Sequence, residues 1–97
     1  INLYLTIKVI FYKSYNKKVM DWRRIQIFNE IAKFSSFTNA SKKIKKSQST
    51  LSRDIIHLEK KIGFKVFKRS IRGIHLTDEG KKLLIIAKEF NSKLLSF

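Results

Sequence analysis

Four polar side chains at the start of one predicted helix have the chemistry needed to contact DNA bases. Gln48, Ser49, Ser52 and Arg53 lie together within residues 48–53. The amide of Gln48 offers the donor and acceptor pair that matches adenine, and the guanidinium of Arg53 offers the two donors that match guanine. The two serine hydroxyls are short enough to reach bases or phosphates. Because the amino end of a helix also favours phosphate, this cluster predicts contacts with nucleic acid.

The helix that carries these residues is predicted over 48–62 from its apolar spacing. Leu51, Ile55, Leu58 and Ile62 recur at steps of three and four residues, which places them on one buried face and the polar cluster on another. Ser47 is expected to cap the first turn, because its hydroxyl can accept from free backbone amides, and Gly63 is expected to end the helix. Ser47 is therefore interpreted first as a cap.

The surrounding elements predict a mainly α fold, a winged helix-turn-helix with three helices, a two-stranded wing and a long final helix. Asp21 is expected to cap a helix over 22–34, and Thr38 a short helix to residue 45. Alternating residues predict strands within 64–70 and 74–76, joined by a turn at 71–73. Thr77 is expected to cap a helix over 78–97. In the helix-turn-helix, the third helix enters the major groove.

Charge and composition narrow the class of protein. The 97 residues include 22 Lys or Arg against 7 Asp or Glu, which gives a net charge of +15. Residues 20–77 contain 14 of the basic residues and 4 of the acidic ones. Such an excess predicts a polyanionic partner, either nucleic acid or an anionic membrane surface. No cysteine and only two histidines are present, and no nucleophile–base pair or phosphate-binding glycine loop is found. We therefore expect no enzyme, no metal and no cofactor.

The final helix has a repeating apolar seam. Its members recur at steps of four and three residues, as in a coiled coil, and are Leu83, Ala87, Phe90, Leu94 and Phe97. The seam could belong to the core of the same chain. Because the domain is small and the seam long, pairing with a second copy is the favoured interpretation.

Residues 36–80 resemble the winged helix-turn-helix domain of LysR-type transcriptional regulators, and residues 20–28 resemble the usual start of that family. The matching residues are Ser36-Phe37-Thr38, Ala40, Ile44, Ser47-Gln48, Leu51-Ser52-Arg53, Ile55, Leu58-Glu59, Gly63, Phe67, Arg69, Arg72-Gly73, and Leu76-Thr77 with Gly80. The chain departs from the family pattern at Ser49, where proline is commonest, at Ser41, where alanine is usual, and at Ile56, where a basic residue is common. The last change removes one possible phosphate contact.

The resemblance implies a bacterial, cytoplasmic, nucleoid-associated regulator that binds an interrupted dyad in promoter DNA as a homodimer, possibly a higher oligomer in a full-length form. It implies base contacts by Gln48, Ser49, Ser52 and Arg53. It also implies wing or backbone contacts by Thr38, Lys46, Ser47, Arg69 and Arg72, with Arg72 in the minor groove. The last helix would pair two subunits through the seam.

The expected organisation has three parts. Residues 1–19 are interpreted as an upstream extension, either read-through or disordered, residues 20–77 as the DNA-binding domain, and residues 78–97 as the linker helix. The family's effector-binding domain is not expected within these 97 residues. Two alternatives stay open from the charge, a nonspecific basic nucleic-acid-binding protein and a membrane-surface protein.

Overall fold

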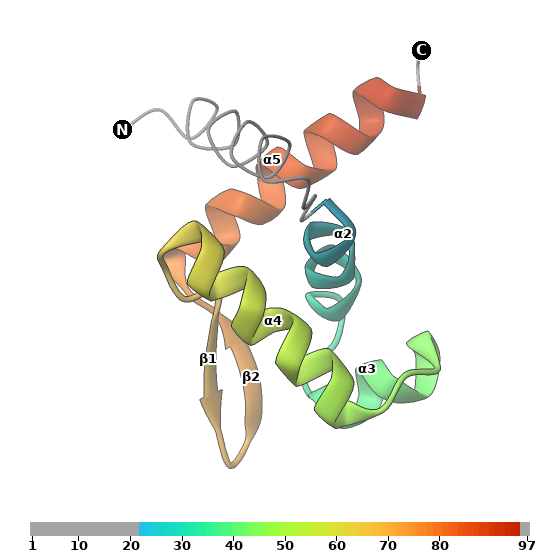
Figure 1. The fold of residues 1–97 in the computed structure, drawn as a ribbon, viewed down its shortest axis with the longest axis vertical. Coiled ribbons are helices and arrows are strands. Elements are labelled where there is room, and N and C mark those ends of the chain that lie inside the picture. The colour runs from blue at the N-terminus through green and yellow to red at the C-terminus, as the bar shows by residue number, and fades with distance from the viewer. Residues whose placement is uncertain (1–21, 96–97) are drawn as a thin grey trace.

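A computed structural model describes residues 22–95 and places four helices and a two-stranded sheet there (Figure 1). The elements are α2 (Trp22–Ile31), α3 (Phe37–Ile44), α4 (Gln48–Ile62), β1 (Phe67–Ser70), β2 (Gly73–Leu76) and α5 (Asp78–Leu95). The order confirms the predicted winged helix-turn-helix and long final helix. The expected Asp21 cap, the 1–19 extension and Phe97 lie outside the described residues.

The three helices of the helix-turn-helix enclose one apolar core. Ile25, Phe28 and Ile31 of α2 pack with Leu51 and further apolar residues of α4, and all of them are fully buried. The predicted first helix extended to residue 34, but α2 ends at Ile31 and a turn follows, in which Phe34 N donates to the carbonyl of Ile31 at 2.9 Å. No helix within the described residues is long and apolar enough to cross a membrane.

The caps of α3 and α4 decide where the turn of the motif lies. Ser47 Oγ accepts from Thr50 N at 3.1 Å, and Gly63 ends α4 with a φ of 87°, so the bounds and both predicted ends of this helix are confirmed. The predicted Thr38 cap is wrong, because Ser36 Oγ accepts from Asn39 N at 3.0 Å and α3 begins one residue earlier than Thr38. Thr38 is instead an exposed residue of the first turn.

The wing is an antiparallel hairpin that is attached to the helices at its base and on one side. Phe67 pairs with Leu76 and Ser70 with Gly73, so the turn at the tip consists of Ile71 and Arg72. Strand β1 begins at Phe67 rather than at residue 64 as predicted. The preceding backbone serves other contacts, since Thr77 N donates to Val66 O at 3.0 Å and Thr77 Oγ1 donates to Lys65 O at 2.6 Å.

Helix α5 packs against α2 with the first half of the predicted seam. Leu83 and Ala87 are only 2% and 1% exposed inside the single chain, so the prediction that they face a second subunit is wrong. The Phe90 ring lies edge-on to Trp22 with centroids 4.9 Å apart but stays 39% exposed. The first part of the seam therefore belongs to the hydrophobic core of the chain itself. The surroundings of the Leu94 side chain lie outside the description.

Candidate nucleic-acid interface

The amino end of α4 and the tip of the wing lie at the same end of the molecule (Figure 1). Gln48, Ser49 and Arg53 are exposed there and Ser52 is half-buried, so the structure brings the four predicted base-contacting residues onto one accessible surface. Ser47 is the cap of α4, and its hydroxyl also donates to Thr50 Oγ1 at 2.8 Å. We call this end of the molecule, from α3 across the start of α4 to the wing tip, the basic face.

Arg69 of β1 joins the wing to the start of α4. Its Nη1 donates to Ser52 Oγ at 2.5 Å, and its guanidinium carbon lies 4.7 Å from the centre of the Phe37 ring of α3. A cation above an aromatic face is attracted by the ring's negative π surface. Arg69 therefore contacts all three parts of the basic face. Its hydrogen bond leaves the Ser52 hydroxyl proton available, so Ser52 can still donate to a base or phosphate.

The acidic residues of α4 are turned away from the basic face. Asp54 is buried, and its Oδ1 accepts from Arg23 Nη2 and from Arg24 Nε of α2, both at 3.3 Å. These contacts hold α4 against α2 and keep this carboxylate away from solvent. A bound polyanion would therefore meet Arg53 without repulsion from its sequence neighbour Asp54.

The second acid of α4, Glu59, anchors the base of the wing. Its buried Oε2 accepts from Val66 N at 2.8 Å and from Phe67 N at 3.4 Å, and its Oε1 lies 3.7 Å from Lys65 Nζ. A buried carboxylate that satisfies two backbone donors fixes the chain more firmly than a neutral acceptor would. Glu59 therefore sets the position of the wing relative to α4.

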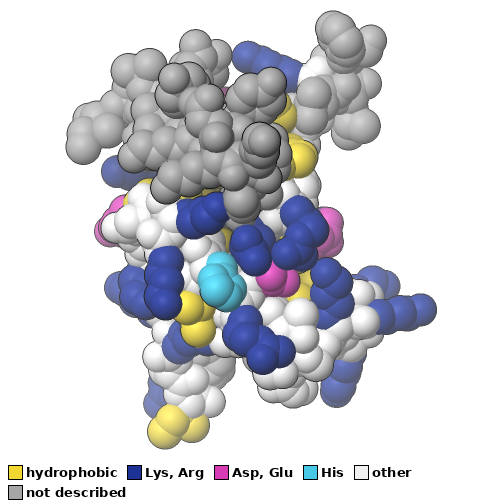
Figure 2. All heavy atoms as spheres, in the orientation of Figure 1, with side chains coloured by type: hydrophobic (Ala, Val, Ile, Leu, Met, Phe, Trp, Pro, Cys, Tyr) yellow, Lys and Arg dark blue, Asp and Glu magenta, His cyan; other side chains and the backbone are white. Residues whose placement is uncertain are grey.

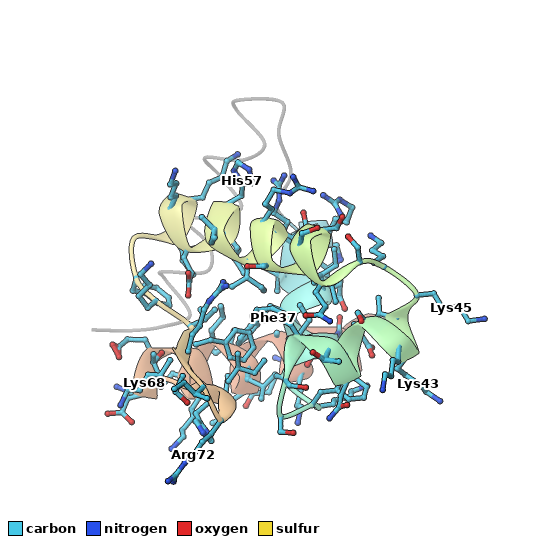
Figure 3. All side chains as sticks on the ribbon, turned by 90° about the horizontal axis from the view of Figure 1, so that it is seen from below. Phe37, Lys43, Lys45, His57, Lys68 and Arg72 are labelled. Atoms are coloured by element: carbon cyan, nitrogen blue, oxygen red, sulfur yellow. The ribbon has the colours of Figure 1, made fainter. Side chains whose placement is uncertain are left out.

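Lysines extend the basic face beyond α4. Lys42, Lys43, Lys45 and Lys46 are all exposed, and Lys45 adopts φ 64° where it ends α3. Figure 3, seen from below, shows Lys43 and Lys45 pointing outward at one edge and Arg72 pointing outward at the opposite edge. Figure 2 shows Lys and Arg side chains distributed over much of the visible side. Such a distribution attracts a long polyanion more than a small ligand.

The wing is held by a backbone contact that the sequence did not indicate. Ile74 N donates to the carbonyl of Ser35 at 2.9 Å, and Gly73 sits so close that an added Cβ would lie 2.2 Å from the same oxygen. At the tip, Ser70 Oγ accepts from Arg72 N at 3.2 Å. Lys68 and His75 are paired across the strands and exposed. The hairpin is therefore fastened at its inner edge while Arg72 stays accessible.

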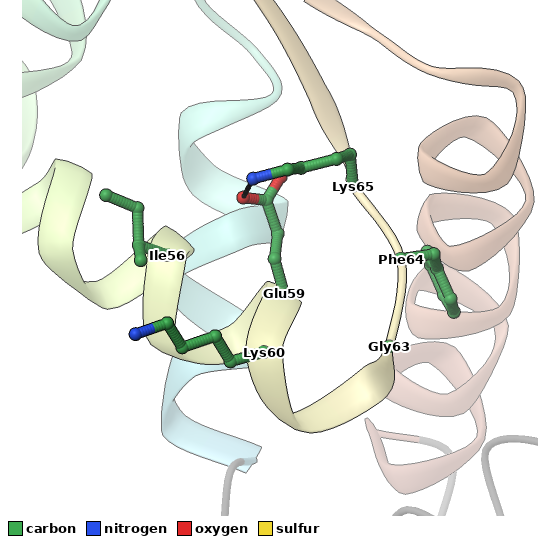
Figure 4. A pocket seen from close by; sticks show the side chains of 6 residues that line it. All are labelled: Ile56, Glu59, Lys60, Gly63, Phe64 and Lys65. Carbon is green, nitrogen blue, oxygen red and sulfur yellow. Dashed lines mark ion pairs between the residues drawn. The ribbon is translucent and has the colours of Figure 1, made fainter.

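A hollow of about 330 Å³ lies at the other end of α4, away from the basic face (Figure 4). It is lined by Ile56, Glu59, Lys60, Gly63, Phe64 and Lys65. The Glu59 carboxylate is already engaged with backbone amides and with Lys65. Within the part of the chain that the structure describes, no group of three His, Cys, Asp or Glu side chains could hold a metal ion.

Comparison with known proteins agrees with this geometry. Residues 22–81 match the family model of the bacterial regulatory helix-turn-helix protein, lysR family. The chain belongs to the LysR family. It is 37% identical over 70 residues to the HTH-type transcriptional regulator TfdT of Cupriavidus pinatubonensis. The aligned residues cover 72% of this chain and 31% of TfdT. It is 32% identical over 79 residues to the glycine cleavage system transcriptional activator of Escherichia coli K12, covering 81% of this chain and 26% of the activator.

Solved structures of the LysR family share the fold. A BenM DBD complex with benA site 1 DNA aligns with a TM-score of 0.72 and 30% identity, covering 79% of this chain and 90% of that one. A CbnR DBD–DNA complex aligns with a TM-score of 0.71 and 29% identity, covering 77% and 86%. The described part of this LysR chain thus has the winged helix-turn-helix fold of these two DNA-bound domains. The chain spans about a third or less of the length of the curated relatives named above.

Sequence reasoning found the residues that face outward and missed those that arrange them. Phe37, Glu59 and Ser35 support the basic face from within the chain, through a ring, a carboxylate and a backbone carbonyl. In the sequence, Phe37 and Glu59 are recognisable only as matches to the family pattern. Their partners lie far away or in the backbone, so no local spacing reveals these roles. The contacts of individual side chains with DNA stay predictions.

Proposed function

We propose that this LysR chain binds double-stranded promoter or operator DNA with sequence specificity. The observation that carries the proposal is the basic face, where Gln48, Ser49, Ser52 and Arg53 lie together at the amino end of α4 beside an accessible wing. The family membership and the two similar domains whose structures contain DNA support it. A DNA partner implies a place in the bacterial cytoplasm, at the nucleoid.

The proposed division of labour follows from the chemistry of the side chains. Gln48 and Arg53 choose bases in the major groove, because only their forked polar ends match a particular base edge. Ser49 and Ser52 add shorter contacts there. Thr38, Lys46, Ser47, Arg69 and Arg72 are proposed to lie along the backbone or in the flanking minor groove. Exposed lysines supply attraction that does not depend on sequence and weakens as salt rises.

We also propose that two copies bind together through α5. Ile85 is 57% exposed on this helix, so it offers apolar surface to a partner. The proposed interface is therefore centred on Ile85 in place of the buried Leu83 and Ala87. Two recognition helices placed about 34 Å apart would enter successive major grooves of an interrupted dyad.

The proposal is tested with duplexes that the full chain selects from a random library. Arg53→Ala should weaken binding to the selected site by about 1–3 kcal/mol and relax the base preference at one position, measured by fluorescence anisotropy. Lys46→Ala removes the same charge from the basic face. Lys46→Ala should lower the affinity for selected and random DNA by similar factors. It should also reduce the slope of affinity against salt concentration.

The rival, a nonspecific basic nucleic-acid-binding protein, predicts a different result. It should bind selected and random duplexes equally at physiological salt, whereas a specific binder retains a ratio of about 10³ or more. Equal affinity of the unaltered chain for both duplexes would overturn the proposal. Equal losses of Arg53→Ala on both would remove Arg53 from the base-contacting set.

A further inference from the structure

Ile71 at the tip of the wing is the most exposed apolar side chain in the described part of this LysR chain. Its relative exposure is 105%, whereas the other exposed large apolar residues, Ile56, Ile85 and Phe90, are 37–57% exposed and lie on helices. Figure 2 shows hydrophobic atoms at the lower tip of the wing. Tight turns usually carry Gly, Asn, Asp, Ser or Pro. An isoleucine in this place makes almost no contact with its own protein.

The tip is held in a defined position. The hairpin is attached to α4 by Glu59, and Ile74 N bonds the carbonyl of Ser35 at 2.9 Å. Phe67 and Ile74, one from each strand, are buried in the core. The turn holds only Ile71 and Arg72, so the position of the tip follows from that of the two strands.

The neighbours of Ile71 indicate what it meets. Arg72 is exposed beside it in the same turn, and the amino end of α4 lies at the same end of the molecule. In the proposed function α4 enters a major groove, and the wing tip with Arg72 lies in the adjacent minor groove of the same duplex. The walls of that groove are sugar rings, and its floor carries a protruding amino group only at guanine. An apolar branched side chain packs on such walls and is obstructed by the amino group.

We propose that Ile71 packs into the minor groove beside Arg72 and makes this chain prefer A·T pairs in the DNA that flanks the major-groove site. The inference rests on the proposed function. A β-branched side chain has few rotamers to lose, so its immobilisation in the groove costs little entropy. Apolar side chains in minor grooves are a recurring device of DNA-binding proteins. Ile71 is thus a specificity-determining residue that forms no hydrogen bond.

The test uses the full chain and its library-selected duplex with flanks made of A·T, G·C or inosine·C pairs. Inosine lacks the minor-groove amino group but keeps the major-groove pattern of guanine. The unaltered chain should bind the duplex with the A·T flank at least about 5-fold more tightly than the one with the G·C flank. This factor is comparable to the affinity cost of one mismatched base pair in a binding site. Inosine·C should restore affinity to within about twofold of A·T.

Two variants isolate the side chain. Ile71→Ser should reduce the A·T to G·C ratio to below about twofold, whereas Ile71→Val, which keeps a branched apolar group, should preserve it. Both changes lie at a fully exposed position, so unfolding curves should coincide with that of the unaltered chain. An unchanged flank ratio in Ile71→Ser, or no rescue by inosine, would overturn the inference while leaving specific binding intact. If the unaltered chain selected no preferred sequence from the random library, the proposed function itself would be overturned.

Discussion

Replacing Gly73 by alanine tests how strongly one close backbone approach positions the wing. Gly73 has a φ of 124°, and an added Cβ would lie 2.2 Å from the Ser35 carbonyl oxygen and 3.3 Å from its carbon. Both neighbours are backbone atoms, which cannot rotate aside as a flexible side chain would. Gly63 offers a matched control, since it has a φ of 87° but an added Cβ meets nothing within 4 Å.

The expected magnitudes differ for a physical reason. The left-handed conformation costs a residue with a Cβ roughly 1–2 kcal/mol, and Gly63→Ala should lose about that amount. Gly73→Ala should lose this and, in addition, about 1 kcal/mol for the hydrogen bond from Ile74 N to Ser35 O. Displacement of buried Ile74 adds about 1 kcal/mol more. The total of about 3–4 kcal/mol is a large share of the roughly 5–15 kcal/mol by which domains are stable to unfolding.

Urea unfolding followed by fluorescence of the single tryptophan, Trp22, measures both variants. DNA binding gives a second readout, in which Gly73→Ala should lose flank preference while keeping the major-groove preference carried by α4. Equal stabilities of the two variants would show that the contact with Ser35 does not restrain the wing. Equal flank preference in Gly73→Ala and the unaltered chain would show that the position of the wing does not determine the preference for flanking base pairs.

Three further predictions concern the supports of the basic face and the surface of α5. Glu59→Ala should destabilise the domain by about 2–4 kcal/mol, since it leaves the amides of Val66 and Phe67 unpaired, whereas Glu30→Ala, which removes the same charge from an exposed pair, should cost under about 0.5 kcal/mol in urea unfolding. Arg69→Ala should cost about 1–2 kcal/mol more stability than Lys68→Ala, and an equal cost would dismiss the contacts with Ser52 and Phe37. Leu83→Asp should unfold the single chain, because it buries a charge, while Ile85→Asp should keep the fold and lower the sedimentation mass; an unchanged mass would refute pairing through this face.

The sequence predicted the elements best where their signals are local. Ser47 and Gly63 are a capping residue and a glycine at the two ends of one apolar spacing, and α4 has those ends. The start of α3 was missed because Ser36 and Thr38 are both good capping residues. Selection between them involves packing of Phe37 against Phe67, whose ring centroid lies 6.2 Å away. That contact joins residues distant in the chain, so no local pattern contains it.

The final helix shows a second limit of periodicity. A seam with steps of three and four residues predicts that one face is buried, but not which partner buries it. In this chain Leu83 and Ala87 are buried where α5 packs against α2, and Gln26 and Asn91 exchange hydrogen bonds of 2.8 and 3.2 Å between the same two helices. The surface proposed for a second copy is therefore placed at the exposed Ile85. Only the placement of α2 separates the two interpretations.

The contact between Arg69 and Ser52 constrains which hydrogen bonds Ser52 could offer to DNA in the proposed complex. Arg69 Nη1 supplies a donor to Ser52 Oγ at 2.5 Å, so the hydroxyl proton is directed away from that bond. In the proposed complex, Ser52 can therefore donate to a major-groove acceptor, such as a purine N7, guanine O6 or thymine O4, or to a phosphate oxygen. One lone pair of the hydroxyl stays available to accept a hydrogen bond. Under the proposed function, the wing would thereby affect base choice in the major groove as well as contact with the flank, through one arginine that also lies over Phe37.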